Sequence, residues 1–173
     1  MRSCIAVYVE NKYGVLTRVA GLFMRRGFNI DSLTVGETDD PRFSRITVTM
    51  TGDEYAREQL ISQVKKLHNV KQVKYLAKDT SVERELMLLK VRNTPTNRSE
   101  IMAATSIYRA KIIDYTVDAI CVEVTGESSK INAFIEVMKP LGIVEMCRTG
   151  VVALERGGHY METQSLDHET ETP

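Results

Sequence analysis

The sequence lacks the features of several large classes of protein. Among its 173 residues, 23 basic side chains balance 23 acidic ones, so the formal net charge is zero. A neutral chain is a poor partner for nucleic acid or for an anionic membrane surface. No apolar run approaches the length needed to cross a bilayer, and no signal or transit peptide is visible. We therefore expect a cytoplasmic protein that binds neither nucleic acid nor membrane.

Motifs that carry catalytic, metal or redox chemistry are missing as well. There is no CxxC pair, P-loop, G-x-G-x-x-G or G-x-S-x-G motif, and the aromatic signature of an RNA-binding sheet is absent. The three histidines do not stand at metal-ligand spacings from Cys, Asp or Glu. Scattered cysteines favour a reducing compartment over a disulfide framework; they are Cys4, Cys121 and Cys147. We therefore expect neither a catalytic residue nor a metal site in the chain.

Strand and helix patterns alternate in the same order in both halves of the chain. Period-2 alternation of apolar residues predicts strands, and recurrence at i, i+3, i+4 and i+7 predicts helices. In the first half the patterns predict extended runs over 5–9, 28–35, 46–50 and 70–75, and helices whose apolar stripes span 16–23 and 60–67. In the second half they predict strands over 86–91, 112–113, 120–124 and 143–154, and helices whose apolar stripes span 101–108 and 131–138. Asp53 and Ser128 are the predicted N-caps of the second helix in each half.

Each half therefore reads as β-α-β-β-α-β, which predicts an α+β protein made of two consecutive ferredoxin-like domains. Right-handed crossovers give the sheet order 4-1-3-2 with both helices on one face, and they leave the other face uncovered. We expect the domains to span 1–78 and 79–156, and the polar segment 157–173 to be a disordered tail. Strand 2 lies at a sheet edge with unpaired backbone groups, so we expect a homodimer in which two copies pair across strand 2.

The turn between the first strand and the first helix is the candidate binding site. Asn11 and Gly14 lie in this turn, directly before the apolar stripe of the helix. The first amide groups of a helix have no intrahelical acceptor, and their dipoles attract a carboxylate or phosphate. Gly14 lacks a Cβ, so it can adopt a positive φ and let a ligand approach the backbone. An ordinary strand–helix turn is the alternative that these residues leave open.

Asn29 lies directly before the predicted edge strand and would complete the candidate site in a dimer. If two copies pair along strand 2, Asn29 of one chain approaches the first helical turn of the other. The side chains of Asn11 and Asn29 would then offer acceptors for an ammonium group, while the helix N–H groups would bind a carboxylate. Apolar walls are expected from Val15, Leu16 and Ile30. This combination matches a small apolar amino acid, although Asn29 could equally be a turn residue beside Gly27.

A long motif runs from Glu10 to Val35: Glu-Asn-x-x-Gly-Val-Leu-x-Arg-Val-x-Gly-Leu-Phe-x-x-Arg-Gly-Phe-Asn-Ile-x-Ser-Leu-Thr-Val. It resembles the regulatory (small) subunit of acetohydroxyacid synthase, also called acetolactate synthase. The likeness continues through residues 38–41, 44–45, 82–87 and 150–154, and so covers nearly the whole chain to about Arg156. The resemblance implies an N-terminal ACT domain, a C-terminal ferredoxin-like domain and a homodimer. It also places the effector-binding residues of the family on Asn11, Gly14 and Asn29, with the backbone near Val15, Leu16 and Ile30 beside them.

The resemblance further implies that this chain does no chemistry and binds no cofactor. The family's large subunit holds thiamine diphosphate, Mg²⁺ and FAD and condenses two 2-keto acids. The small subunit activates it and confers feedback inhibition by a branched-chain amino acid, typically valine, with leucine or isoleucine as the other candidates. A stand-alone ACT-domain sensor that acts on a different enzyme would share every feature of the first domain. An independent enzyme and a ferredoxin-like nucleic-acid binder are weaker alternatives.

Overall fold

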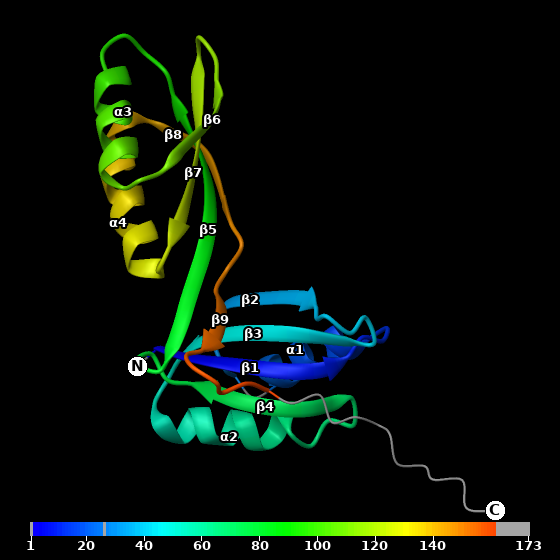
Figure 1. Ribbon diagram of the computed structural model, residues 1–173. Coiled ribbons are helices and arrows are strands. Elements are labelled where there is room, and N and C mark those ends of the chain that lie inside the picture. The colour runs from blue at the N-terminus through cyan, green and yellow to red at the C-terminus, as the bar shows by residue number, and fades with distance from the viewer. Residues whose placement is uncertain (1, 26, 162–173) are drawn as a thin grey trace, which may run out of the picture. The chain divides into compact units, whose positions relative to one another are not determined.

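The computed structural model describes residues 2–25 and 27–161, and the chain divides into two compact units (Figure 1). The first unit comprises the chain up to Val82 together with the segment that begins at Ala153, and the second unit is Glu83–Val152. The predicted tail, 157–173, is described only as far as Met161, so the rest of that prediction lies outside the described residues.

The first unit contains a four-stranded antiparallel sheet and two helices. The elements are β1 (Arg2–Glu10), α1 (Val15–Arg25), β2 (Ile30–Glu37), β3 (Phe43–Thr51), α2 (Glu54–Val64) and β4 (Val70–Leu76). The strands are ordered β2-β3-β1-β4, and each neighbouring pair is antiparallel. The predicted 4-1-3-2 order is thereby confirmed, and β2 lies at an edge of the sheet.

The helices of the first unit pack on one face of this sheet because both are amphipathic. Val19 and Phe23 of α1 are fully buried against Ile5 and Val7 of β1 in one apolar cluster. Within α1 the predicted stripe is wrong at its first position, since Leu16 is 44% exposed. The helix begins one residue earlier, and successive helical residues are about 100° apart, so the preceding valine takes the buried place.

The two predicted N-caps have different outcomes. Asp53 caps α2, because its Oδ1 accepts a hydrogen bond of 2.7 Å from the Ala56 N–H. Ser128 does not cap α4; it is the first helical residue, and its hydroxyl donates to Glu85 Oε2 at 3.0 Å. The Glu85 carboxylate is buried, so it needs donors, and Arg148 supplies the others at 2.6 and 2.8 Å.

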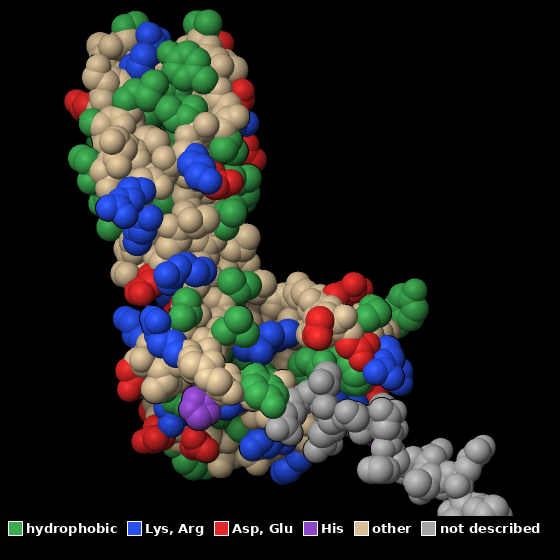
Figure 2. Space-filling model, in the orientation of Figure 1, with side chains coloured by type: hydrophobic (Ala, Val, Ile, Leu, Met, Phe, Trp, Pro, Cys, Tyr) green, Lys and Arg blue, Asp and Glu red, His purple; other side chains and the backbone are tan. Residues whose placement is uncertain are grey.

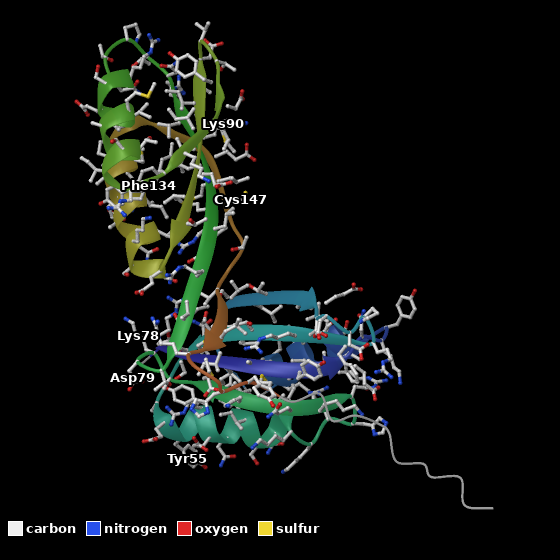
Figure 3. The ribbon with its side chains drawn as sticks, in the orientation of Figure 1. Tyr55, Lys78, Asp79, Lys90, Phe134 and Cys147 are labelled. Atoms are coloured by element: carbon white, nitrogen blue, oxygen red, sulfur yellow. The ribbon has the colours of Figure 1, made fainter. Side chains whose placement is uncertain are left out.

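The second unit repeats the topology of the first. Its elements are β5 (Ser81–Arg92), α3 (Arg98–Ile107), β6 (Lys111–Tyr115), β7 (Ala119–Gly126), α4 (Ser128–Met138), a short 3₁₀ helix (Lys139–Leu141) and β8 (Ile143–Arg148). The last strand, β9 (Val152–Glu155), starts at the final residue of this unit. The strands are ordered β6-β7-β5-β8, and β9 pairs with β5. The predicted second ferredoxin-like fold is therefore confirmed. Phe134 of α4 is buried in the apolar core between the helices and the sheet of this unit, whereas Cys147 is exposed on β8 (Figure 3).

The segment that begins at Ala153, within β9, belongs to the first unit, although the sequence analysis assigned 153–156 to the second domain. Arg156 N donates to Thr80 O at 2.8 Å, and Arg45 Nη2 donates to Ala153 O at 2.7 Å. Alternate residues of β1 face this segment rather than the helices, and Ala6 and Tyr8 among them are buried. The face of the first sheet that we expected to be uncovered is therefore covered by the chain's own residues 153–161 (Figure 1).

Candidate effector site at the first strand–helix turn

The turn that joins β1 to α1 is built from local backbone hydrogen bonds. Lys12 N donates to Glu10 O at 2.9 Å, and Val15 N donates to Lys12 O at 3.3 Å. Gly14 has a φ of +78°, and no atom lies within 4 Å of the position that a Cβ would occupy. The predicted positive φ at Gly14 is thus confirmed, and the backbone there is open to solvent.

The first turn of α1 presents amide groups without neutralising acids. Gly14 O accepts the first helical hydrogen bond, from Arg18 N at 3.0 Å. Within residues 2–25 and 27–161, no hydrogen-bond acceptor pairs with the amides of Leu16 and Thr17, and the first helical turn contains no acidic residue. The partial positive charge of the helix end therefore remains available to an anion.

The carboxamide of Asn11 is held in one orientation by two acceptors. Its Nδ2 donates to Glu37 Oε1 and to Pro41 O, each at 3.0 Å. Both bonds reach the β2–β3 hairpin, and a third, from Asn11 N to Arg42 O at 2.7 Å, ties the backbone to it. The amino group must face these acceptors, so Oδ1 is the side-chain atom left to accept a hydrogen bond from a ligand.

A charged cluster holds the base of the turn. The Glu10 carboxylate accepts hydrogen bonds from Lys71 at 2.7 Å, Lys12 at 2.9 Å and Asn69 at 2.8 Å. These three donors, Lys71 foremost, lower the pKa of Glu10 to about 2. Asn69 Oδ1 in turn accepts from Arg18 Nη1 at 2.9 Å, so the cluster joins the end of β1, the start of β4 and the first turn of α1. The negative charge of Glu10 is therefore neutralised by the adjacent ammonium groups of Lys12 and Lys71.

The three apolar residues that were predicted to form the walls of the site lie in different surroundings. Leu16 is exposed beside the helix N-terminus, and Ile30 is half-buried at the start of β2. The Val15 side chain is 4% exposed and lies in the apolar core, so it cannot form a wall of the site as predicted. Only its backbone faces the turn, because helical phase directs its side chain toward the sheet.

Asn29 and Asn11 lie at opposite ends of β2 within one chain. Asn29 is exposed and directly precedes the strand, whereas Asn11 is hydrogen-bonded to Glu37, the last residue of the strand. An eight-residue strand spans about 25 Å. A single chain therefore does not bring together the residues that the sequence assigned to one site.

The sequence did not reveal Glu37, Asn69 or Lys71 as neighbours of the turn. Glu37 is separated by 26 residues from Asn11, and Asn69 by 59 residues from Glu10. No local spacing rule connects positions so far apart, and only the predicted sheet order brings β2 and β4 to the same end of the unit.

The described part of the chain contains no group of three His, Cys, Asp or Glu side chains placed to hold a metal ion. Among the same residues, no helix is both long and apolar enough to span a membrane. Basic and acidic side chains are interspersed over the visible face of the protein (Figure 2).

Comparison with known proteins gives two adjacent family matches. Residues 5–72 match the AHAS small subunit-like ACT domain, and residues 84–157 match the small subunit of acetolactate synthase. The chain belongs to the acetolactate synthase small-subunit family. A probable small subunit from Archaeoglobus fulgidus is 50% identical over 91% of this chain and 98% of its own length. The isozyme 3 small subunit of Escherichia coli is 44% identical over 93% of this chain and 99% of its own length.

A solved structure supports the same family assignment. The acetolactate synthase small subunit from Thermotoga maritima superposes with a TM-score of 0.85 and 39% sequence identity. The match spans 92% of this chain and 99% of the Thermotoga maritima chain. The resemblance inferred from the Glu10–Val35 motif is therefore confirmed, together with the fold of two ferredoxin-like domains.

Proposed function

We propose that this chain is the non-catalytic regulatory subunit of an acetolactate synthase. It activates a catalytic large subunit and makes that subunit sensitive to feedback inhibition by a branched-chain amino acid. Valine is the first candidate effector, and leucine and isoleucine are the others. Thiamine diphosphate, Mg²⁺ and FAD belong to the large subunit in this proposal, and both subunits act in the cytoplasm. The supporting observation is the open helix N-terminus at Gly14 in a chain of the small-subunit family.

The proposed effector site forms between two copies of the chain. Strand β2 is at the edge of its sheet, so its outer backbone groups can pair with a second β2. A two-fold axis makes such pairing antiparallel, and the start of one strand then lies beside the end of the other. Asn29 of the partner subunit thereby approaches Asn11 and the first turn of α1. The separation of about 25 Å within one chain is what this arrangement requires.

Each part of a branched-chain amino acid has a matching group in this arrangement. The carboxylate binds the amides of Leu16 and Thr17 at the helix N-terminus. The ammonium donates to Asn11 Oδ1, the atom left available by the two bonds of Nδ2, and to Asn29 of the partner subunit. The branched side chain packs on Leu16 and on Ile30 of the partner subunit, because both residues keep exposed apolar surface.

The free energies of these contacts suit a metabolite sensor. A carboxylate at a helix N-terminus contributes about 0.3–2 kcal/mol. Burial of a valine-sized side chain contributes about 1.5–3 kcal/mol, and each hydrogen bond to a charged group about 1.5–3 kcal/mol. After the cost of association is subtracted, the dissociation constant falls roughly between micromolar and millimolar.

Inhibition then follows from linkage between effector binding and dimer arrangement. A ligand held by both chains stabilises the arrangement in which the Gly14 turn and the partner's Asn29 are closest. If the large subunit is most active with another dimer arrangement, effector binding shifts the population away from that arrangement and lowers activity. The size of the shift is set by the difference in effector affinity between the two arrangements, typically about 1–3 kcal/mol.

Reconstitution tests the proposed function. The purified chain is added to the catalytic subunit encoded by the same organism, and acetolactate formation is measured with increasing valine, leucine or isoleucine. We expect the chain to raise activity and at least one of the three amino acids to reverse that increase. If the chain binds an amino acid but leaves the catalytic subunit unaffected and does not co-purify with it, a stand-alone sensor is the better description.

A further inference from the structure

A cavity of about 140 Å³ lies in the first unit, between the start of α1 and the loop that joins α2 to β4 (Figure 1). Its apolar wall is formed by four aliphatic residues, Val15, Val19, Leu67 and Val70. A closed apolar cavity of about 150 Å³ holds a benzene molecule, so this space fits an apolar group of that size or smaller. Apart from Val15, none of the residues predicted for the effector site lines this cavity.

Among the described residues that line this cavity, three are basic and none is acidic. The basic residues are Arg18, Lys66 and His68, and all three are exposed, so they stand at the mouth of the cavity. In the same part of the chain none of them forms an ion pair, and Arg18 Nη1 donates to a neutral acceptor, Asn69 Oδ1, at 2.9 Å. Like charges that gather at one place repel each other, and an anion among them lowers the electrostatic energy.

The carboxylate of Glu10 does not compensate these charges. Asn69 separates it from Arg18, because the carboxamide accepts from Arg18 through Oδ1 and donates to Glu10 through Nδ2 at 2.8 Å. Glu10 is itself paired with Lys71 at 2.7 Å and with Lys12 at 2.9 Å, and it does not line the cavity. The mouth of the cavity therefore keeps an excess of positive charge.

The turn before β4 adds backbone donors beside the cavity. Val70 N donates to Leu67 O at 2.9 Å, which closes a turn with His68 and Asn69 at its centre. Within residues 2–25 and 27–161, no acceptor pairs with the amides of these two central residues. Unpaired amides in a turn, together with cationic side chains, favour the binding of an oxyanion.

We propose that this cavity is a second binding site, for a small monocarboxylate with a short aliphatic body. The carboxylate binds at the mouth, where Arg18 and Lys66 supply charge-assisted hydrogen bonds. The aliphatic body lies against the four apolar residues of the wall, which do not solvate a multiply charged inorganic ion. Ligands of drug size need about 300–1,000 Å³ and do not fit. The proposal does not depend on amino-acid binding at the Gly14 turn.

A matched pair of probes tests the charge requirement. The full chain is titrated with 3-methylbutanoate and with 3-methylbutanamide, which differ in charge but hardly in shape, and the backbone amide shifts are followed by NMR. We expect the His68 and Asn69 amides to shift on addition of the carboxylate. The carboxylate should bind at least about fivefold more tightly than the amide probe, and more tightly than inorganic phosphate.

Two neighbouring lysines provide a matched test of position. Lys66→Gln removes a charge from the mouth of the cavity, whereas Lys65→Gln removes the same charge from an exposed residue that does not line it. We expect Lys66→Gln to weaken 3-methylbutanoate binding at least about threefold, and Lys65→Gln to leave it unchanged. The double variant Arg18→Gln/Lys66→Gln should weaken binding by about tenfold or more.

A charge reversal guards against a fold defect caused by Arg18→Gln. Lys66→Glu leaves Arg18 in place and puts a carboxylate at the mouth of the cavity, so it should abolish binding of 3-methylbutanoate. Equal affinity for the two probes would overturn the proposal, as would equal weakening by Lys65→Gln and Lys66→Gln. Tighter binding of inorganic phosphate, or the absence of shifts at about 50 mM carboxylate, would overturn it too. Shifts that are confined to the first turn of α1 and lost in Gly14→Asp would place the probe at the effector turn and would also overturn the proposal.

Discussion

The side chains of Asn11 and Glu37 are hydrogen-bonded, with Asn11 Nδ2 donating to Glu37 Oε1 at 3.0 Å. The same nitrogen donates to Pro41 O, so the amide of the turn is oriented by the β2–β3 hairpin. This bond joins the β1–α1 turn to the end of the edge strand through which we propose that the dimer forms. A change in the pairing of β2 would therefore directly alter the position of the Asn11 side chain in the turn.

Asn11→Asp should abolish the response to valine although it preserves the shape of the side chain. An aspartate cannot donate to Glu37 and Pro41, and its charge repels both acceptors. We expect the valine concentration for half inhibition to rise about tenfold or more, with activation of the large subunit retained. Asn132→Asp is the matched control, because Asn132 Oδ1 accepts from Arg148 and an aspartate can do the same. If both variants keep full valine sensitivity, Asn11 is not an effector-binding residue.

Substitutions at Gly14 should separate anion binding from backbone strain. Gly14→Asp places a carboxylate at the helix N-terminus, so we expect valine inhibition to be lost while activation remains. Gly14→Ala meets no neighbouring atom, and its cost is the positive φ, about 1–2 kcal/mol of stability. Alanine should therefore leave valine inhibition largely intact. The measurement is the valine inhibition curve of each reconstituted complex. If Gly14→Asp and Gly14→Ala lose valine inhibition to the same extent, the effect comes from the backbone conformation alone and not from the added carboxylate.

Mixed dimers should show that Asn29 acts on the partner subunit's turn. When one chain carries Asn11→Ala and the other carries Asn29→Ala, both lesions fall in the same composite pocket, and the other pocket is intact. Calorimetry should therefore find one valine site per mixed dimer. If both changes are placed on the same chain and paired with a wild-type chain, each pocket contains one lesion and no full-affinity site should remain. The reverse pattern would mean that Asn29 serves its own chain.

The charged cluster at Glu10 should give the first unit a specific acid dependence. The pKa of Glu10 is lowered from 4.5 to about 2, so its ionised form stabilises the folded state. That contribution is fully present above about pH 4.5 and is lost as the pH falls toward 2. Urea unfolding of Glu10→Gln and wild type should therefore differ most at neutral pH and converge on acidification. The exposed Asp79, labelled in Figure 3, provides the control Asp79→Asn, which should follow wild type throughout.

Periodicity predicted the elements and their order because amphipathic strands and helices carry that information locally. It predicted the sheet order as well, since right-handed crossovers leave few alternatives. It assigned Leu16 wrongly to the buried stripe of α1, although Val19 and Phe23 are buried as predicted. Leu16 is turned by about 100° from Val15, which takes the buried place. It also missed the covering of the first sheet by residues 153–161, which depends on pairing between residues far apart in the chain.

The candidate site was predictable to a similar extent. Gly14 was identified because a positive φ in a strand–helix turn requires little besides the local sequence. The roles of Glu37 and Asn69 were not predictable, because each is brought to the turn by another strand. The burial of Val15 was missed for the same reason as the error in the stripe.

A crystal structure of the chain grown with saturating valine tests the central claim most directly. We predict a dimer in which two β2 strands pair antiparallel, with valine between the first turn of α1 and Asn29 of the partner subunit. Its carboxylate should accept from the Leu16 and Thr17 amides. Valine bound elsewhere, or a dimer whose β2 edges do not meet, would contradict the account.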